Sequence, residues 1–320
     1  MVDRECRKKV AVVAVGGNSL IKDKNRQSIN DQYAAACESM AHIASMIEAG
    51  WEVVLTHGNG PQVGFMQRRS ELAAHELPRL PLDYSGAHTQ GSIGYMFQRA
   101  LYNEFRKRAI HKLPVTLVTQ TLVDRNDPAF QQPTKPIGSF MDEQTARNHQ
   151  EQYGWQVVED AGRGWRRVVP SPSPKRIIEQ PAIRSLVEAG YVVISTGGGG
   201  IPVIEDEKGG LEGVEAVIDK DLSASILASS IHARLFLIST AVEKVALNFN
   251  KPGQRWIDLM TLTEAKQYMS EGHFAKGSME PKIRAVIHYL ENGGERAIIS
   301  DPEHIEAALA GQNGTHIVAA

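Results

Sequence analysis

Short apolar runs that end in glycine set the pattern of this chain. Residues 10–15 are continuously apolar, as expected for a strand buried on both faces, and Gly16-Gly17-Asn18 follows them. A second run, 51–56, leads into Gly58-Asn59-Gly60, and a third, 191–196, leads into four consecutive glycines. Glu-Ala-Gly comes shortly before each of the last two runs. This repeated pattern predicts the same local arrangement at both places: a helix, a parallel strand and a loop of bare backbone.

Between these runs the apolar spacing changes to that of an amphipathic helix. The first helix is predicted from apolar positions on one face, which are Tyr33, Cys37, Met40, Ala44 and Ile47. Asn30 or Asp31 is a candidate N-cap, and Gly50 stands where a left-handed helix end is expected. Further strands are predicted at 114–119, 235–240 and 297–300. Alternating strands and helices predict an α/β fold with a mainly parallel sheet and right-handed crossovers.

The stretch from about residue 124 to residue 174 differs from the rest because it is rich in proline. Residues 155–159 and 165–169 are strand-like runs, and the segment 160–164 between them is typical of the turn of a β-hairpin. An insertion that is bounded by prolines and carries its own hairpin is typical of a protruding subdomain. We therefore expect residues 124–174 to form such a subdomain, called the lid below.

Composition and charge indicate which partners and which cellular compartment to expect. The 320 residues are 42% hydrophobic and 22% charged, with a formal net charge of -2, which favours neither nucleic acid nor an anionic membrane as a partner. Cys6 and Cys37 form no CxxC pair, which suits a reducing compartment. The run 10–15 is too short for a signal-peptide core or a membrane span, so we expect a cytoplasmic protein.

The three glycine clusters are the first candidates for chemistry. In open α/β sheets ligands bind beyond the carboxyl ends of the strands, where backbone N–H groups and helix starts attract anions. One such cluster is most often a tight turn, but three at one sheet edge favour an anion site.

Several common motifs are missing from the sequence. It contains no G-x-x-x-x-G-K-[ST], no G-x-G-x-x-G, no protein-kinase signature and no H-E-x-x-H. For His57 and His88, packing or turn roles are favoured over ligand binding.

Three lysines stand in contexts suited to phosphoryl transfer, which requires positive charge around the transferred group. Lys135 lies between prolines in the lid, while Lys220 and Lys282 each lie at the start of a predicted helix. A lysine taken alone is most often a solvated surface charge. Asp219 and Asp221 flank Lys220, and composition alone leaves two interpretations open: a helix cap with a local ion pair, or carboxylates that orient a catalytic lysine.

Taken together, these segments resemble those of carbamate kinases. The matching segments run in order from about residue 10 to about residue 300: 15–20, 56–64, 127–138, 160–169, 197–202, 213–222 and 273–279. The lid segment and the 213–222 segment distinguish carbamate kinases from other amino-acid kinases. The resemblance therefore covers essentially the whole chain.

The resemblance implies a three-layer αβα sandwich with a protruding lid. It implies that residues 1–212, including the lid, form a substrate lobe and that 213–320 form a nucleotide-binding lobe. It further implies phosphoryl transfer between MgATP or MgADP and carbamate or carbamoyl phosphate, in a homodimer. Mg²⁺ is expected to be held mostly by phosphate oxygens and water, so no metal-ligating residue is predicted.

The resemblance also implies roles for individual residues. The cradle for carbamoyl phosphate would consist of Gly16, Gly17, Asn18, Gly58, Asn59 and Gly60. Lys135 would come down with the lid onto the substrate phosphate, and Lys220 would bridge the transferred group. Asp221 would hold the lysines in place, and Lys282 would bind nucleotide phosphates. Further nucleotide-binding positions would be Gly198, Gly199, Thr240, Ala241, Glu243, Phe274, Ala275 and Ser278.

Some positions depart from the carbamate-kinase pattern. The usual Thr-Asp-Val-Asp-x-Val-Tyr reads Thr-Ala-Val-Glu-Lys-Val-Ala over residues 240–246, which predicts altered nucleotide handling. Lys276 stands where a proline is usual, and Ser85 and His88 stand where Cys and Met are usual. Two alternatives therefore stay open: another small-acid kinase of the same fold, or a weakly catalytic homologue that binds nucleotide or carbamoyl phosphate.

Overall fold

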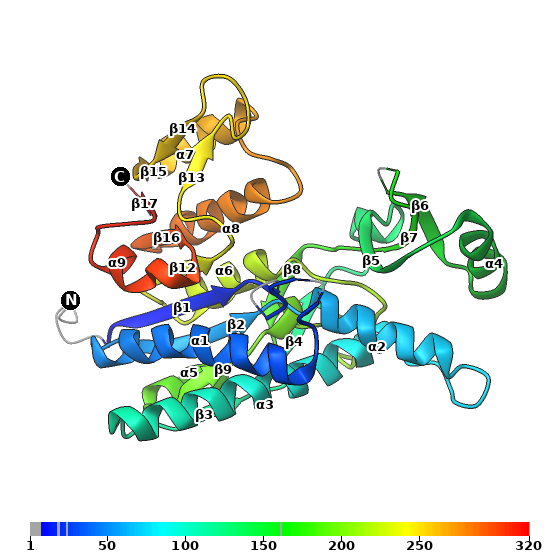
Figure 1. Cartoon of the computed structure of the whole chain (residues 1–320), viewed down its shortest axis with the longest axis horizontal. Coiled ribbons are helices and arrows are strands. Elements are labelled where there is room, and N and C mark those ends of the chain that lie inside the picture. Colours follow the sequence, from blue (N-terminus) through cyan, green and yellow to red (C-terminus); the bar gives the residue numbers. More distant parts are fainter. Residues whose placement is uncertain (1–7, 18–19, 24, 161, 320) are drawn as a thin grey trace.

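A single eight-stranded sheet forms the centre of the molecule in the computed structural model, which describes residues 8–17, 20–23, 25–160 and 162–319 (Figure 1). In spatial order its strands are β15 (Leu259–Thr261), β17 (Thr315–Val318), β16 (Arg296–Ser300), β12 (Leu235–Ser239), β1 (Val10–Val15), β2 (Glu52–His57), β9 (Val192–Ile194) and β3 (Pro114–Thr116). The strands from β16 to β3 are parallel, and β17 pairs antiparallel with β16. The prediction of a mainly parallel sheet is confirmed.

Helices cover both faces of this sheet. One face packs against α1 (Ile29–Glu48), α3 (Leu82–Arg108) and α9 (Ile305–Leu309), and the other against α5 (Gln180–Glu188), α6 (Lys220–Ser230), α7 (Leu262–Ser270) and α8 (Met279–Glu291). Successive residues of β1 alternate between the two cores: Val13 belongs to the first, and Val12 and Ala14 belong to the second. The strand is therefore buried on both faces, and the fold is the predicted three-layer αβα sandwich.

A second sheet carries the lid. Its strands are, in order, β11 (Leu211–Gly213), β10 (Ile201–Glu205), β4 (Gln120–Val123) and β8 (Pro174–Ile177). Because β4 and β8 are paired, the chain leaves for the lid and returns from it at neighbouring strands. The lid itself contains η3 (Pro128–Phe130), β5 (Lys135–Met141), α4 (Glu143–Tyr153), β6 (Gln156–Glu159) and β7 (Trp165–Val169).

The lid projects from the body of the molecule, and α2 (Gly60–Leu72) extends alongside it (Figure 1). Strands β6 and β7 pair antiparallel, with Gln156 opposite Val168, so the predicted hairpin is confirmed. The remaining elements are η4 (Gly197–Gly199), β13 (Val245–Leu247), β14 (Arg255–Ile257) and η5 (Pro302–His304). Among the described residues, no helix is both long and apolar enough to cross a bilayer.

Three local predictions need correction. Helix α1 is capped by Ser28 and not by Asn30 or Asp31, because the Ser28 hydroxyl accepts from the Asp31 backbone and the Asp31 carboxylate accepts from the Ser28 backbone. The strand predicted at 114–119 ends at Thr116, and the strand predicted at 191–196 ends at Ile194. Thr196 cannot continue the second strand because its φ of 49° lies in the left-handed region.

Candidate active site

The glycine clusters meet at one edge of the central sheet. Strands β1, β2 and β9 are neighbours, so the loops at their carboxyl ends lie side by side. The first two loops touch backbone to backbone: a Cβ atom on Gly58 would lie 2.5 Å from the backbone nitrogen of Gly17. Glycine is required at this contact because any side chain would separate the loops. The glycine clusters therefore converge as predicted, and the glycines at this contact serve the close packing of the two loops.

Helix α2 starts directly after the second loop. Asn59 occupies its N-cap position, but the Asn59 side chain makes no capping hydrogen bond. Its amide instead donates to the Thr89 hydroxyl of α3 at 2.8 Å. Asn59 therefore leaves the first-turn N–H groups of α2 without a cap from its own side chain, which suits an anion at this helix start.

The four glycines at 197–200 have a different environment. Gly198, Gly199 and Gly200 all have left-handed φ values, and a Cβ atom on Gly197 would overlap with the ring of His57. The Gly199 carbonyl accepts from the hydroxyls of Thr121 and Ser223. These glycines therefore allow the loop to pass between buried side chains. The predicted nucleotide contacts Gly198 and Gly199 do not line the main cavity described below.

Two lysines and one aspartate form the charged centre of the site. Asp221 Oδ1 lies 2.5 Å from Lys220 Nζ, and Asp221 Oδ2 lies 2.8 Å from Lys282 Nζ. Burial opposes ionisation of Asp221, whose side chain is 6% exposed, but the two ammonium groups outweigh burial and lower its pKa to about 2. Asp221 is thus a fixed anion that joins the starts of α6 and α8.

Asp219 has a separate task at the start of α6. Its carboxylate accepts from the backbone N–H groups of Asp221 and Leu222, at 3.0 and 3.2 Å, and so caps the helix. The two interpretations left open by the sequence therefore apply to different residues: Asp219 is the cap and Asp221 orients the lysines. Lys135 reaches the same helix start from the lid, with its Nζ 3.8 Å from Asp219 Oδ2.

A cavity of about 590 Å³ brings most of these groups together. Its lining includes glycines of the first two loops, both buried lysines and the end of β12: Gly16, Gly17, Gly58, Gly60, Lys220, Lys282, Thr240 and Ala241. A second cavity, of about 400 Å³, lies between α2 and β5 and is lined by Asn59, Gly60, Lys135 and Arg166. Gly60 lines both cavities. The arrangement suits an anion held between backbone N–H groups and lysines.

Comparison with known proteins agrees with this geometry. Residues 9–301 match the model of the amino acid kinase family. This chain belongs to that family.

The chain is 50% identical over 313 residues to carbamate kinase of Thermococcus kodakarensis, which covers 97% of this chain and 99% of the relative. It is also 50% identical over 314 residues to carbamate kinase-like protein YahI of Escherichia coli, again covering 97% and 99%. The solved structure of carbamate kinase from Giardia lamblia bound to AMP-PNP matches with a TM-score of 0.93 at 41% identity, covering 98% of this chain and 99% of that chain. The predicted resemblance to carbamate kinases is confirmed.

The other predicted nucleotide positions lie in varied surroundings. Phe274 is 4% exposed and packs in the core on the α8 side of the sheet. Glu243 is exposed, as are Ala275 and Ser278 just before α8. Ser278 is the N-cap residue of the helix that carries Lys282. Asn18, predicted for the substrate side, lies outside the described residues.

Two residues near the site were not predicted from the sequence. Arg166 lines the smaller cavity, but the sequence shows it only as one of two arginines in a hairpin strand. Gln90 ties α3 to the site by donating to the carbonyls of Thr119 and Gly197, at 3.0 Å each. A glutamine in a helix carries no signal in a single sequence.

His57 is a packing residue, as favoured from the sequence. Its ring is buried against Phe97, with ring centroids 5.7 Å apart, and Nδ1 lies 3.1 Å from the Gly58 carbonyl. Burial, and secondarily the charge of Lys220, lower the pKa of His57 to about 4. The imidazole is therefore neutral at physiological pH.

Proposed function

We propose that this protein interconverts carbamate and carbamoyl phosphate with MgATP and MgADP. The observation that carries the proposal is the Lys220–Asp221–Lys282 centre beside the glycine loops of β1 and β2. Relatives at 50% identity that are named carbamate kinase, and a structural match that binds AMP-PNP, support the same reaction. In the direction of ATP formation, the bond between phosphorus and the carbamoyl oxygen breaks, and a new bond forms to a terminal oxygen of ADP.

Each charged residue has a defined part in this proposal. Lys220 and Lys282 neutralise the oxygens of the transferred group and of the nucleotide, and Asp221 keeps both ammonium groups in place before substrate arrives. Lys135 adds a third positive charge from the lid. Asp221 stays ionised well below neutral pH, so it keeps its negative charge between the two lysines over the physiological range.

The glycine residues supply the anion cradle on the substrate side. The larger cavity is lined by Gly16, Gly17, Gly58 and Gly60 together with the two lysines, and backbone N–H groups there can approach phosphate oxygens. Thr240 and Ala241 line the same cavity at the end of β12, which is the proposed nucleotide side.

We assign Mg²⁺ to the nucleotide phosphates and not to a protein cage. Lysines dominate the charge of the centre, and among the described residues no group of three or more His, Cys, Asp or Glu is placed to hold a metal ion. Such a donor set fits phosphate oxygens, which would in turn hold the ion together with water. The ion would supply charge neutralisation on the transferred group.

The lobes, the assembly and the location follow as further parts of the proposal. Residues 1–212 would bind substrate and 213–320 would bind nucleotide, since the glycine loops of β1 and β2 belong to the first and Lys282 and the end of β12 to the second. We also propose that the protein is a homodimer, as the resemblance to carbamate kinases implies. A location in the cytoplasm is proposed as well, which the low cysteine content supports.

The test is a coupled assay of ATP formation from carbamoyl phosphate and MgADP. The wild-type protein should form ATP, and Lys220→Ala should lose on the order of 10²–10³ in rate. Lys266→Ala is a matched control because Lys266 is an exposed residue of α7 that pairs with Glu291 at 2.6 Å; it should keep full activity. Binding of MgADP without ATP formation by the wild type would overturn the proposal in favour of a binding role or another acid substrate.

A further inference from the structure

The charged contact that the lid makes at the site is weaker than two charged contacts that it makes farther away. Lys135, its contribution to the site, lies 3.8 Å from Asp219 and is 43% exposed, which is a weak, solvent-screened contact. Two other charged contacts join the lid to the body, one to the loop that follows α2 and one to Glu215, and both involve arginine side chains. An apolar cluster also packs the lid against the body, with Ile137 and Val169 of the lid against Val63 and Leu82. The position of Lys135 therefore depends on this cluster together with the two arginine contacts.

The first contact is a stack between Arg79 and two rings of the lid. Arg79 lies in the loop between α2 and α3, and its guanidinium carbon is 3.2 Å from the centroid of the Tyr153 ring. The same carbon is 5.7 Å from the Trp155 ring. Arg79 Nε is buried and has no hydrogen-bond partner among the described residues. The aromatic faces are thus the main partners shown for this part of the cation.

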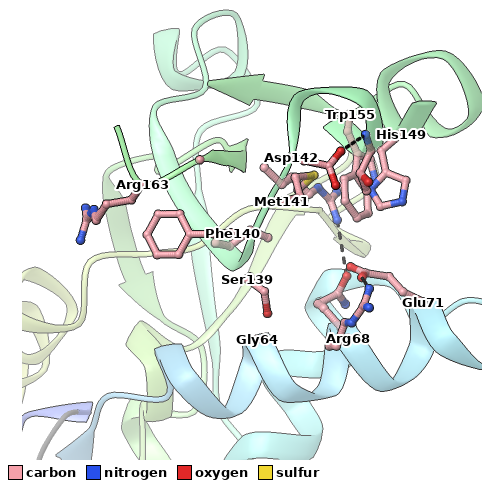
Figure 2. A pocket seen from close by; sticks show the side chains of 16 residues that line it. Gly64, Arg68, Glu71, Ser139, Phe140, Met141, Asp142, His149, Trp155 and Arg163 are labelled. Carbon is pink, nitrogen blue, oxygen red and sulfur yellow. Dashed lines mark hydrogen bonds and ion pairs between the residues drawn. The ribbon is translucent and has the colours of Figure 1, made fainter. Parts of the chain in front are cut away.

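The rings themselves are held in place within the lid. His149 packs edge-on against Trp155, with ring centroids 4.5 Å apart, and lies 5.5 Å from the Tyr153 ring. Figure 2 shows His149 and Trp155 on the lid side of a cavity, with Arg68 and Glu71 of α2 on the opposite side. The cavity has a volume of about 560 Å³, so between these side chains the lid and α2 are not closely packed. Contact by Arg79 is therefore important for keeping this side of the lid close to the body.

The second contact is an ion pair made by Arg167. Its guanidinium lies 4.8 Å from the Trp155 ring and 2.7 Å from Glu215 of the body. The other oxygen of Glu215 accepts from the backbone N–H of Leu82, at the start of α3. Trp155 thus contacts two guanidinium groups, that of Arg167 from the lid and that of Arg79 from the body. The loop that carries Arg79 leads into α3, and Glu215 binds the first residue of this helix.

We propose that Arg79 is a positioning residue that holds the lid closed and thereby places Lys135 at the site. This inference rests on the proposed function, since it assigns Lys135 to the substrate phosphate. Arg79 touches neither cavity that contains the charged centre and acts only through the lid. A cation–π contact is weak enough to break in each cycle, so the lid can open for exchange of substrate and product.

The decisive variant is Arg79→Ala, with Arg79→Lys as the conservative partner. Loss of one partly desolvated cation–π contact lowers the ratio of closed to open lid by about fivefold to thirtyfold. The KM for carbamoyl phosphate should rise by up to this factor, while kcat and the KM for MgADP should change by less than about twofold, because saturating substrate restores closure. Arg79→Lys should recover part of the loss. Arg69→Ala, on α2 with its guanidinium against Met66, is the matched control and should leave every constant unchanged.

Two further measurements separate closure from a general loss of structure. Hydrogen exchange in residues 135–169 should accelerate in Arg79→Ala without ligand, while the melting temperature stays within about 2 °C of the wild type. In a double-mutant cycle, adding Arg79→Ala to Tyr153→Leu should raise the KM by less than about twofold more, because the stack is already lost.

Unchanged KM and unchanged lid exchange in Arg79→Ala would overturn the inference, as would additive effects in the cycle. Failure of the proposed function has a different signature. A wild type without ATP formation refutes that reaction, whereas hydrogen exchange of the lid still tests the Arg79 contact.

Discussion

The charged centre and the lid use the same kinds of side chain in opposite surroundings. At the centre, Asp221 joins two lysines whose side chains are only 13% and 17% exposed, and its pKa is about 2. In the lid, Lys135 makes a long contact to Asp219 near solvent. Charges that are buried and fully paired stay rigid, whereas charges paired near water can separate at little cost. The molecule therefore combines a fixed centre with a movable third cation.

The largest effect on stability is expected from breaking the buried centre. Asp221→Asn leaves two buried ammonium groups without their anion, and removal of one partner of a buried pair typically costs about 3–5 kcal/mol. We expect the free energy of unfolding to fall by this amount in urea titrations, and ATP formation to be lost. Asp258→Asn is the control, because Asp258 is 80% exposed and pairs with Lys244 at 2.7 Å. Equal urea midpoints for Asp221→Asn and wild type would contradict the comparison.

A somewhat smaller effect is expected from His57 at acid pH. Its pKa is about 4 in the folded protein and 6.5 for the free group, because burial disfavours the charged ring. The unfolded chain therefore binds the proton first. The contribution of His57 to stability is complete above pH 6.5 and is lost as the pH falls to 4, by about 3 kcal/mol in all.

His57→Gln should remove this part of the pH dependence. The measurement is urea unfolding of both proteins at a series of pH values between 7 and 4, and the difference between the two curves isolates His57 from other titrating groups. A constant difference across the range would show that the ring is not buried as described.

The smallest effect on folding is expected from the lid lysine. Lys135→Ala removes an exposed contact, which contributes less than about 1 kcal/mol. Its kcat/KM for carbamoyl phosphate should nevertheless fall by about 10²-fold, since a charge directed at the transferred group is lost. Lys175→Ala, an exposed pair with Asp124 at 2.6 Å, should change neither quantity. A strongly destabilised Lys135→Ala would remove the contrast between the two regions.

Much of the architecture was accessible from the sequence, for local physical reasons. Continuous apolar runs predicted β1, β2 and β12 because strands buried on both faces are mostly apolar. The spacing of Met40, Ala44 and Ile47 predicted the buried face of α1. The hairpin of the lid followed from two short runs around a glycine-containing turn.

Other features depended on contacts between distant segments. Asp219 and Asp221 look alike in the sequence, and only the position of Lys282, 61 residues beyond Asp221, gives them different tasks. The glycines at 197–200 looked like an open anion loop, but the buried ring of His57 and the Asn59 side chain occupy the space around them. Phe274 was predicted to contact nucleotide and packs in the core.

Sequence by itself therefore determined which segments become strands and helices, and that the glycine-containing loops follow neighbouring parallel strands. These depend on apolar periodicity and on the order of strands in a parallel sheet, which are local or topological properties. Only the tertiary structure decided which carboxylate pairs with which lysine and how Arg79 meets the lid. Such pairings depend on side-chain distances of a few ångströms between segments far apart in the chain, and no periodicity along the sequence encodes them.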